Sequence, residues 1–116
     1  MAHKKILIVD NDSSVCDSMA TLLRLEGYSV DETTDSAEAE MLIKKERYDV
    51  CLFDYKMDGL KGTDLLKLTK NENPRCLVFI ISGMVDIDKS STKLADGIIN
   101  KPFHIEALLQ RIAATA

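Results

Sequence analysis

Five short apolar runs alternate along the chain with segments in which apolar residues recur at helical spacing. The runs cover residues 6–9, 28–30, 50–53, 77–81 and 97–99. Three of them, 6–9, 50–53 and 77–81, are continuously apolar, which is typical of parallel strands buried on both faces. The run at 28–30 is more polar, so we expect it nearer an edge. The pattern predicts five β-strands.

The segments between these runs predict helices. The first follows Asp12 or Ser13, either of which can cap it, and ends before Gly27, which can adopt a left-handed conformation. Its apolar residues at helical spacing are Val15, Met19, Leu22 and Leu23. The other predicted helices cover residues 36–46, 63–70, 86–95 and 104–114, and the pattern is poorest over 86–95.

Regular alternation of strand and helix predicts an α/β domain with a five-stranded parallel sheet and helices on both faces. Right-handed crossovers place the carboxyl ends of all strands at one edge of the sheet, where ligands of such folds bind. The 116 residues suit one domain over 1–116, and we expect no output domain in this chain.

Charge and hydropathy exclude several classes of protein. The chain has 15 basic and 19 acidic residues, a net charge of −4, which argues against direct nucleic-acid binding through a broad basic surface. The longest apolar run, residues 76–81, is too short to span a bilayer. The apolar stretch near the start ends at Asp10, too early for a secretory signal. We therefore expect a cytoplasmic protein without membrane contact.

The three cysteines, Cys16, Cys51 and Cys76, are widely spaced and lie among apolar neighbours. They form no paired motif that would hold zinc. We interpret all three as small buried side chains.

Polar residues follow four of the predicted strands. They are Asp10-Asn11-Asp12, Asp54 with Asp58 downstream, Ser82-Gly83 and Lys101. Helix caps and turns would explain Asp12 and Asp58, but a carboxylate at the buried end of a strand, such as Asp54, needs a partner. Clustered carboxylates suit Mg²⁺ or Mn²⁺, a lysine can hold an anion, and a carboxylate can attack phosphorus. These residues predict a site that accepts a phosphoryl group on an aspartate.

With these residues in this order, the sequence resembles the receiver domain of two-component response regulators. The resemblance extends from residue 5 to about residue 113. The matching pieces are the run 6–9 with Asp10, Asp54 with Met57 and Gly62, Ser82-Gly83, and Lys101-Pro102-Phe103. The resemblance implies the flavodoxin-like, doubly wound fold of that family.

The resemblance also implies a role for each site residue. Asp54 would be the phosphoacceptor, and Asp10, Asn11, Asp54 and the carbonyl of Lys56 would hold Mg²⁺. Ser82 and Lys101 would bind the phosphoryl oxygens, and Gly83, Lys56 and Met84 would border the phosphoryl group. Lys56 and Met84 are our candidates for setting the lifetime of the phosphorylated state. The Lys101–Pro102 bond is a candidate cis peptide.

Four departures from the family pattern limit what the resemblance implies. Asn11 replaces an acid, so the pocket of Asp10, Asp54 and Lys101 has formal charge −1 instead of the usual −2, and we expect weaker Mg²⁺ binding unless Asp12 or Asp58 compensates. Asp58 replaces a proline, and Ile98 replaces the aromatic residue of the usual switch. The span from Ser82 to Lys101 is about one helical turn short, so we expect the helix there to be short, shifted or partly unwound.

By this resemblance the phosphoryl group would come from a sensor histidine kinase or a phosphotransfer protein. The signal would pass to a downstream protein or a fused output domain, and a homodimer is possible. Such a domain catalyses only its own phosphotransfer and dephosphorylation. Two alternatives stay open: a receiver-like interaction module that is seldom phosphorylated, and an aspartate-nucleophile phosphohydrolase that would use Asp10.

Overall fold

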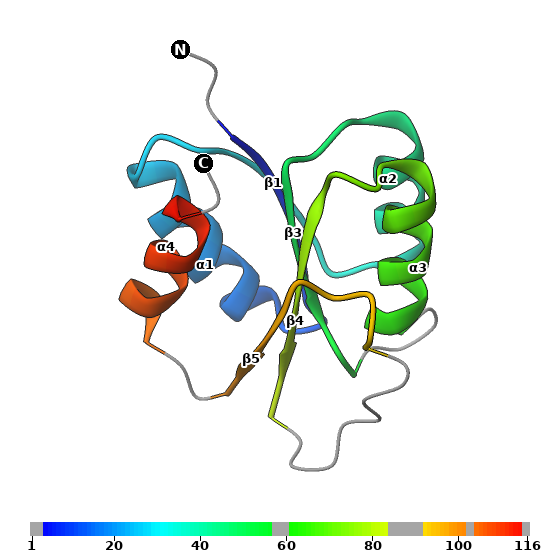
Figure 1. Cartoon of the computed structure of the whole chain (residues 1–116). Coiled ribbons are helices and arrows are strands. Elements are labelled where there is room, and N and C mark those ends of the chain that lie inside the picture. The colour runs from blue at the N-terminus through cyan, green and yellow to red at the C-terminus, as the bar shows by residue number, and fades with distance from the viewer. Residues whose placement is uncertain (1–3, 57–60, 84–91, 102–103, 115–116) are drawn as a thin grey trace.

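The structure is a computed structural model that describes residues 4–56, 61–83, 92–101 and 104–114. These residues form the strands β1 (Lys5–Val9), β2 (Ser29–Thr33), β3 (Val50–Asp54), β4 (Leu77–Ser82) and β5 (Gly97–Asn100). They also form the helices α1 (Ser13–Leu25), α2 (Ser36–Lys45), α3 (Gly62–Glu72) and α4 (Ile105–Ala113). Each strand overlaps one of the five apolar runs, although β2 ends three residues later than its run, so the predicted order of five strands is confirmed (Figure 1).

The five strands form one parallel sheet in the order β2-β1-β3-β4-β5. Strand β2 lies at an edge, as its polar residues predict. There Arg24 Nη2 donates a hydrogen bond of 2.8 Å to the backbone oxygen of Val30. The strand order reverses between β1 and β3, and such a switch point opens a crevice at the carboxyl ends of the two strands.

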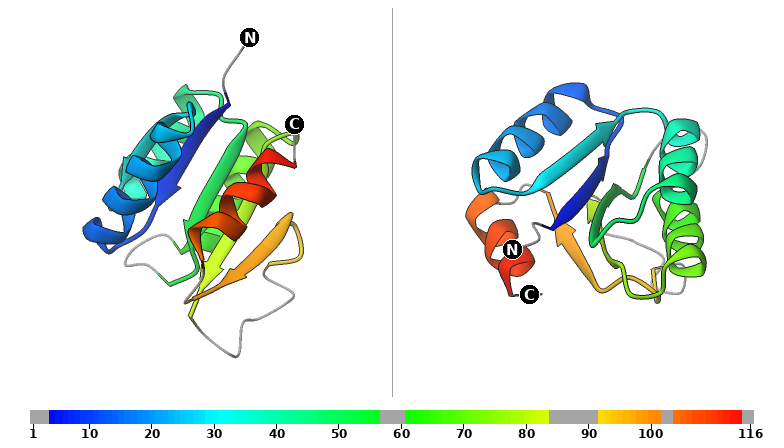
Figure 2. Two further views of the ribbon diagram at one scale, coloured as in Figure 1. Left: turned by 90° about the vertical axis from the view of Figure 1, so that its left-hand side faces the viewer. Right: turned by 90° about the horizontal axis from the view of Figure 1, so that it is seen from above.

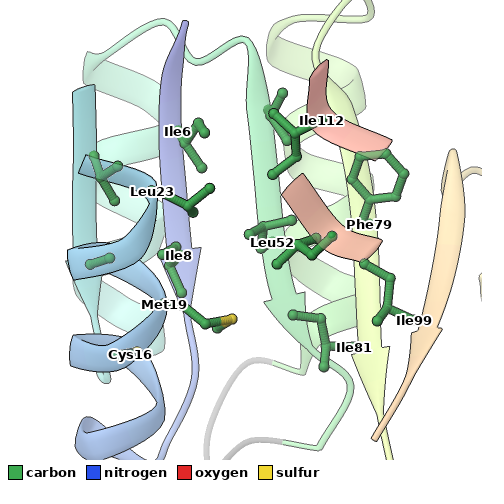
Figure 3. Close-up of a cluster of buried hydrophobic side chains, with 14 residues drawn as sticks. Ile6, Ile8, Cys16, Met19, Leu23, Leu52, Phe79, Ile81, Ile99 and Ile112 are labelled. Atoms are coloured by element: carbon green, nitrogen blue, oxygen red, sulfur yellow. The ribbon is translucent and has the colours of Figure 1, made fainter. Parts of the chain in front are cut away.

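Helices α1 and α4 cover one face of the sheet, and α2 and α3 cover the other (Figure 1, Figure 2). Successive residues of a strand point to opposite faces. In β1, Ile6 and Ile8 join the core beside α1 and α4, shown in Figure 3, while Leu7 and Val9 join the core beside α2 and α3. The central strands are therefore apolar throughout because both of their faces are buried.

The helix ends follow local sequence signals. The Asp12 carboxylate accepts hydrogen bonds from the N–H groups of Ser14 and Val15 and caps α1, and Asp35 caps α2 by accepting from Ala37. Gly27, just after α1, has a φ of 96°, a conformation that favours glycine. Among the described helices, none has the length and apolar character needed to cross a bilayer.

The predicted helix over residues 86–95 is wrong where it can be compared with the structure. Residues 92–94 form a turn, in which Ala95 N–H donates to the oxygen of Thr92 over 3.0 Å. Directly afterwards, Asp96 N–H bonds to the oxygen of Val78 on β4 at 2.8 Å, so the chain is already joining the sheet. The remainder, residues 86–91, lies outside the described residues.

Candidate functional site

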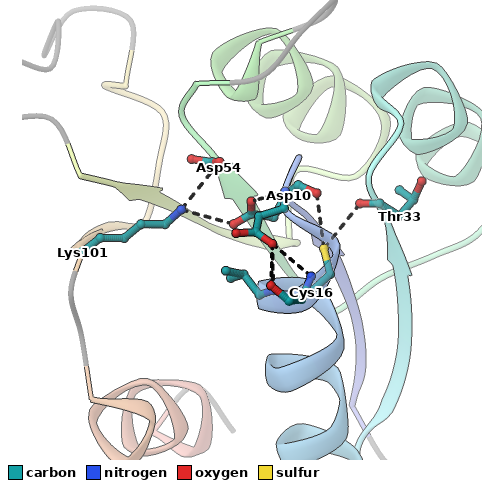
Figure 4. Close-up of polar contacts among 8 residues, drawn as sticks. Asp10, Cys16, Thr33, Asp54 and Lys101 are labelled. Carbon is teal, nitrogen blue, oxygen red and sulfur yellow. Dashed lines mark hydrogen bonds and ion pairs between the residues drawn. The ribbon is translucent and has the colours of Figure 1, made fainter.

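Four of the predicted site residues lie together at the carboxyl edge of the sheet. Asp10 follows β1, Asp54 ends β3, Ser82 ends β4 and Lys101 follows β5. Lys101 reaches across the switch point, with its Nζ 3.3 Å from Asp10 Oδ2 and 3.7 Å from Asp54 Oδ2 (Figure 4). The fold therefore joins residues that are up to 91 positions apart in sequence.

The two carboxylates are almost removed from water. Asp10 is 1% exposed and Asp54 is 6% exposed, whereas the side chain of Lys101 keeps 32% of its surface. Burial raises the pKa of Asp54 to about 6, and the nearby Asp10 carboxylate acts in the same direction. Lys101 lowers the pKa of Asp54, but by less than burial and Asp10 raise it. A single ammonium group therefore does not fully neutralise the two carboxylates. A further positive charge would stabilise this pocket.

Asp10 is fixed by backbone contacts at the start of α1 and the end of β2. Its Oδ1 accepts a hydrogen bond from Asp12 N–H at 3.0 Å, and its own N–H donates to the oxygen of Thr33 at 3.3 Å. The thiol of Cys16 donates to the backbone oxygen of Asp10, with Sγ 3.4 Å away, and lies 3.7 Å from the oxygen of Thr33 (Figure 4). Sequence reasoning assigned Cys16 only to the core and missed this tether.

The backbone of Asp54 is held in place by the neighbouring strand β4 and by the first residue of α3. Tyr55 N–H donates to the oxygen of Ile81 at 2.8 Å, which continues the sheet past the end of β3. Gly62, the first residue of α3, is buried against Asp54. A Cβ atom there would lie 2.2 Å from the backbone oxygen of Asp54, so no larger residue fits without moving the site. In the sequence, Gly62 stood out only through the resemblance to receiver domains. Its contact with Asp54 joins two different elements, and no local pattern reveals it.

Asn11 and Asp12, the two residues after Asp10, differ in the hydrogen bonds that their side chains make. Asn11 is exposed beside the pocket. Asp12 Oδ1 accepts from Ser14 Oγ at 2.7 Å, from Ser14 N–H at 3.0 Å and from Val15 N–H at 3.4 Å. The bonds from Ser14 lower the pKa of Asp12, and that oxygen is committed to the helix cap. Asp58, the other proposed compensating acid, lies outside the described residues.

The remaining predicted residues border the pocket where they are described. Ser82 is 1% exposed, and its backbone oxygen accepts from Lys101 N–H at 2.7 Å. Gly83 is exposed, and a Cβ there would meet only Lys101 Cβ, at 3.7 Å. Lys56 is exposed, and its backbone N–H bonds to the carboxylate of Asp54. Met84, Met57, Pro102 and Phe103 lie outside the described residues.

The donor set suits a small hard cation. Two buried, partly compensated carboxylates offer the oxygen ligands that Mg²⁺ prefers, and an amide oxygen and a backbone carbonyl lie beside them in sequence. Within residues 4–56, 61–83, 92–101 and 104–114, no three His, Cys, Asp or Glu side chains are grouped to hold a metal ion. Among the described residues, the buried carboxylates that could bind Mg²⁺ are those of Asp10 and Asp54.

A protein-family model described as the response regulator receiver domain matches residues 6–113, and the chain belongs to this family. Among curated proteins, the cell cycle response regulator CtrA of Brucella ovis is 29% identical, over 95% of this chain and 49% of CtrA. The chain spans less than half the length of the first curated relatives that it matches.

Solved structures show the same fold. The CheY-like response regulator receiver domain protein of Methanospirillum hungatei JF-1 has a TM-score of 0.92 and 31% identity, with 97% of this chain and 93% of that chain covered. The TrrA response regulator of Thermotoga maritima, in complex with Mg²⁺-BeF, has a TM-score of 0.89 at 21% identity, with 97% and 99% covered. The chain is thus a receiver domain of two-component signal transduction, the kind of module that accepts a phosphoryl group. Domains of this family bind Mg²⁺.

Proposed function

We propose that this receiver domain accepts a phosphoryl group on Asp54 in a Mg²⁺-dependent step. The observation that carries the proposal is the pair of buried carboxylates, Asp10 and Asp54, joined by Lys101 at the switch point. Helix caps and turns give no reason for burying two acids there. A pocket that binds a cation and then a phosphoryl group does give one.

The transfer step follows from the chemistry of Asp54. Its carboxylate oxygen attacks the phosphorus of a phosphohistidine on the partner, the P–N bond breaks, and the imidazole leaves with the bonding electrons. A pKa of about 6 still leaves Asp54 largely ionised at neutral pH, as this attack requires. Lys101 would bind a phosphoryl oxygen, and Ser82 would donate its hydroxyl to another. Gly83, Lys56 and Met84 would border the group, and the last two would set its lifetime.

The metal site would consist of Asp10, the amide oxygen of Asn11, Asp54 and the carbonyl of Lys56. A bound Mg²⁺ would neutralise the carboxylates and the phosphoryl oxygens as they come together. We expect weaker Mg²⁺ binding than in receivers that have an acid at position 11, because an amide contributes no charge. Asn11→Asp should tighten Mg²⁺ binding in a calorimetric titration; an unchanged Kd would contradict this.

The donor would be a sensor histidine kinase or a phosphotransfer protein in the cytoplasm, and the output would be a protein contact or a fused domain. We propose no direct contact with nucleic acid or membrane, and no turnover chemistry beyond phosphotransfer and dephosphorylation of the chain itself. A phosphorylation-dependent homodimer would be one form of output.

The decisive experiment is intact-mass analysis after incubation with acetyl phosphate and Mg²⁺. The wild-type chain should gain one phosphoryl group, and Asp54→Asn should gain none while keeping its circular dichroism spectrum. No gain by the folded wild-type chain would instead favour the interaction module that is seldom phosphorylated, to which the departures at Asn11 and Ile98 point.

A further inference from the structure

Cys51 and Cys76 lie in contact inside the core beside α2 and α3, toward the amino-terminal ends of β3 and β4, whereas Asp54 ends β3. Cys51 is the second residue of β3 and Cys76 immediately precedes β4, and their Sγ atoms are 3.6 Å apart. They are 0% and 1% exposed. The receiver mechanism uses neither side chain, so the pair is free to have another role.

The two thiols have different surroundings. The facing Cys51 thiol, together with the ammonium of Lys70, lowers the pKa of Cys76, while burial raises the pKa of Cys51. Lys70 also donates to the backbone oxygen of Cys76 at 2.6 Å. Cys76 is therefore the more easily ionised thiol, and a thiolate is the nucleophile in thiol oxidation. Cys51 is the protonated partner beside it.

The chain just before Cys76 is a short turn at the surface. A four-residue turn leads into β4, closed by a hydrogen bond of 3.0 Å from Cys76 N–H to the oxygen of Asn73. Its central residues, Pro74 and Arg75, are exposed. Opening of a short surface turn requires far less free energy than global unfolding. It would expose Cys76 to solvent while Cys51 stays covered within the sheet.

We propose that Cys51 and Cys76 form a reversible disulfide when the protein meets a peroxide. The Cys76 thiolate attacks one oxygen of the peroxide, the O–O bond breaks, and a sulfenic acid forms while the departing oxygen takes up a proton. The Cys51 sulfur then attacks the Cys76 sulfur, loses its proton, and displaces the sulfenic oxygen as water. Each hydrogen peroxide oxidises one dithiol and is reduced to two waters. Two molecules of a thiol such as glutathione restore the pair: the first forms a mixed disulfide with one cysteine, and the second releases that cysteine as a thiol and leaves as glutathione disulfide.

Formation of the disulfide would affect the residues just before β5 through a short series of hydrogen bonds and an ion pair. Lys70 links the oxygen of Cys76 to Asp96, whose Oδ2 lies 2.8 Å from Lys70 Nζ and also accepts from Val78 N–H at 2.8 Å. Drawing Cys76 toward Cys51 would displace the carbonyl that Lys70 holds. Oxidation would therefore alter the segment entering β5 independently of phosphorylation.

The test is mass spectrometry of the intact chain treated with hydrogen peroxide, with digestion under non-reducing conditions. We expect a loss of two hydrogens and a tryptic cross-link between residues 48–56 and 76–89, both reversed by dithiothreitol. Cys51→Ala and Cys76→Ala should abolish the cross-link. Cys16→Ala, which removes the third buried thiol, should retain it.

Alkylation of the native wild-type chain provides a test that does not depend on variants that fold. Iodoacetamide should modify Cys76 faster than Cys51, and peroxide pretreatment should protect both until dithiothreitol is added. The proposal is overturned if Cys51 reacts first, if peroxide adds oxygen to Cys76 without a cross-link, or if the treated chain keeps its mass and both of its reactive thiols.

Discussion

At the scale of single residues, Asp54 shows how strongly one position depends on the charges around it. Its pKa of about 6, against an ordinary 3.8, results mainly from burial and then from the Asp10 carboxylate. In the metal-free protein the folded state therefore favours protonated Asp54. The stabilising contribution of this proton is complete below about pH 3.8 and is lost as the pH rises through about 6.

We therefore expect Asp54→Asn to stabilise the metal-free protein at pH 7. A pKa difference of one corresponds to about 1.4 kcal/mol, so a gain of about 1–2 kcal/mol in the free energy of unfolding is reasonable. Urea unfolding in EDTA at pH 7 and pH 5 should show that the advantage of the variant shrinks at the lower pH. The exposed Glu72→Gln serves as the control, and an equal gain there would refute the argument.

Gly62 has no room for a side chain. Because an added Cβ would lie 2.2 Å from the backbone oxygen of Asp54, Gly62→Ala must displace the end of β3 or the start of α3. We expect a loss of about 1–3 kcal/mol in stability, together with slower phosphorylation by acetyl phosphate. Gly83→Ala is the matched control for stability, since its Cβ meets only Lys101, at 3.7 Å. Thermal melts of both variants that coincide would show that the close approach is unimportant.

At the scale of elements, α1 connects the pocket to the edge of the sheet. Its N-terminus is capped by Asp12, whose Oδ1 takes three hydrogen bonds from residues 14 and 15. Asp10 and Cys16 flank this cap, so the geometry of the first turn also sets the position of the pocket.

Removing the cap should therefore weaken the helix. We expect Asp12→Ala to lower the free energy of unfolding by about 1 kcal/mol, and Asp12→Ser, which can still cap, to restore most of that loss. Chemical denaturation of the three proteins would measure both effects. Equal stability of the Ala and Ser variants would mean that the cap contributes nothing.

The sequence predicted best the features that depend on the type of each element and on the residues at the strand ends. Continuous apolar runs indicated the buried parallel strands, and parallel strands necessarily bring Asp10, Asp54 and Lys101 to one edge. The hydrogen bond from the Cys16 thiol to the Asp10 oxygen and the close contact of Gly62 with Asp54 could not be predicted, because each depends on how separate elements pack. The helix expected over 86–95 was wrong at its end because pairing of residue 96 with β4 outweighed a weak helical pattern.

At the scale of the whole molecule, the pocket lies between the two halves of the sheet. Asp10 belongs to the half that continues through α1 to β2, and Asp54 to the half that continues through α3 to β4. A cation held by both carboxylates would tie these halves together at the switch point, so its binding should stabilise the fold cooperatively.

Mg²⁺ should accordingly raise the melting temperature of the wild-type chain in a saturable manner, because a ligand that binds only the folded state adds RT ln(1 + [Mg²⁺]/Kd). The increase should be larger in Asn11→Asp and much smaller in Asp54→Asn. Differential scanning fluorimetry across a Mg²⁺ series would measure it, with an equal ionic strength of NaCl as the control. An identical increase in all three proteins would indicate a general salt effect.

The hydrogen bond from Arg24 to Val30 occupies a backbone oxygen on the edge strand β2. An outermost strand usually offers a row of free backbone groups to which another chain can add. On β2 the Val30 oxygen is already taken by the guanidinium, 2.8 Å away, and Asp31 and Glu32 follow it with negative charge. At this position another strand cannot use the Val30 oxygen to extend the sheet beyond β2 without first displacing Arg24.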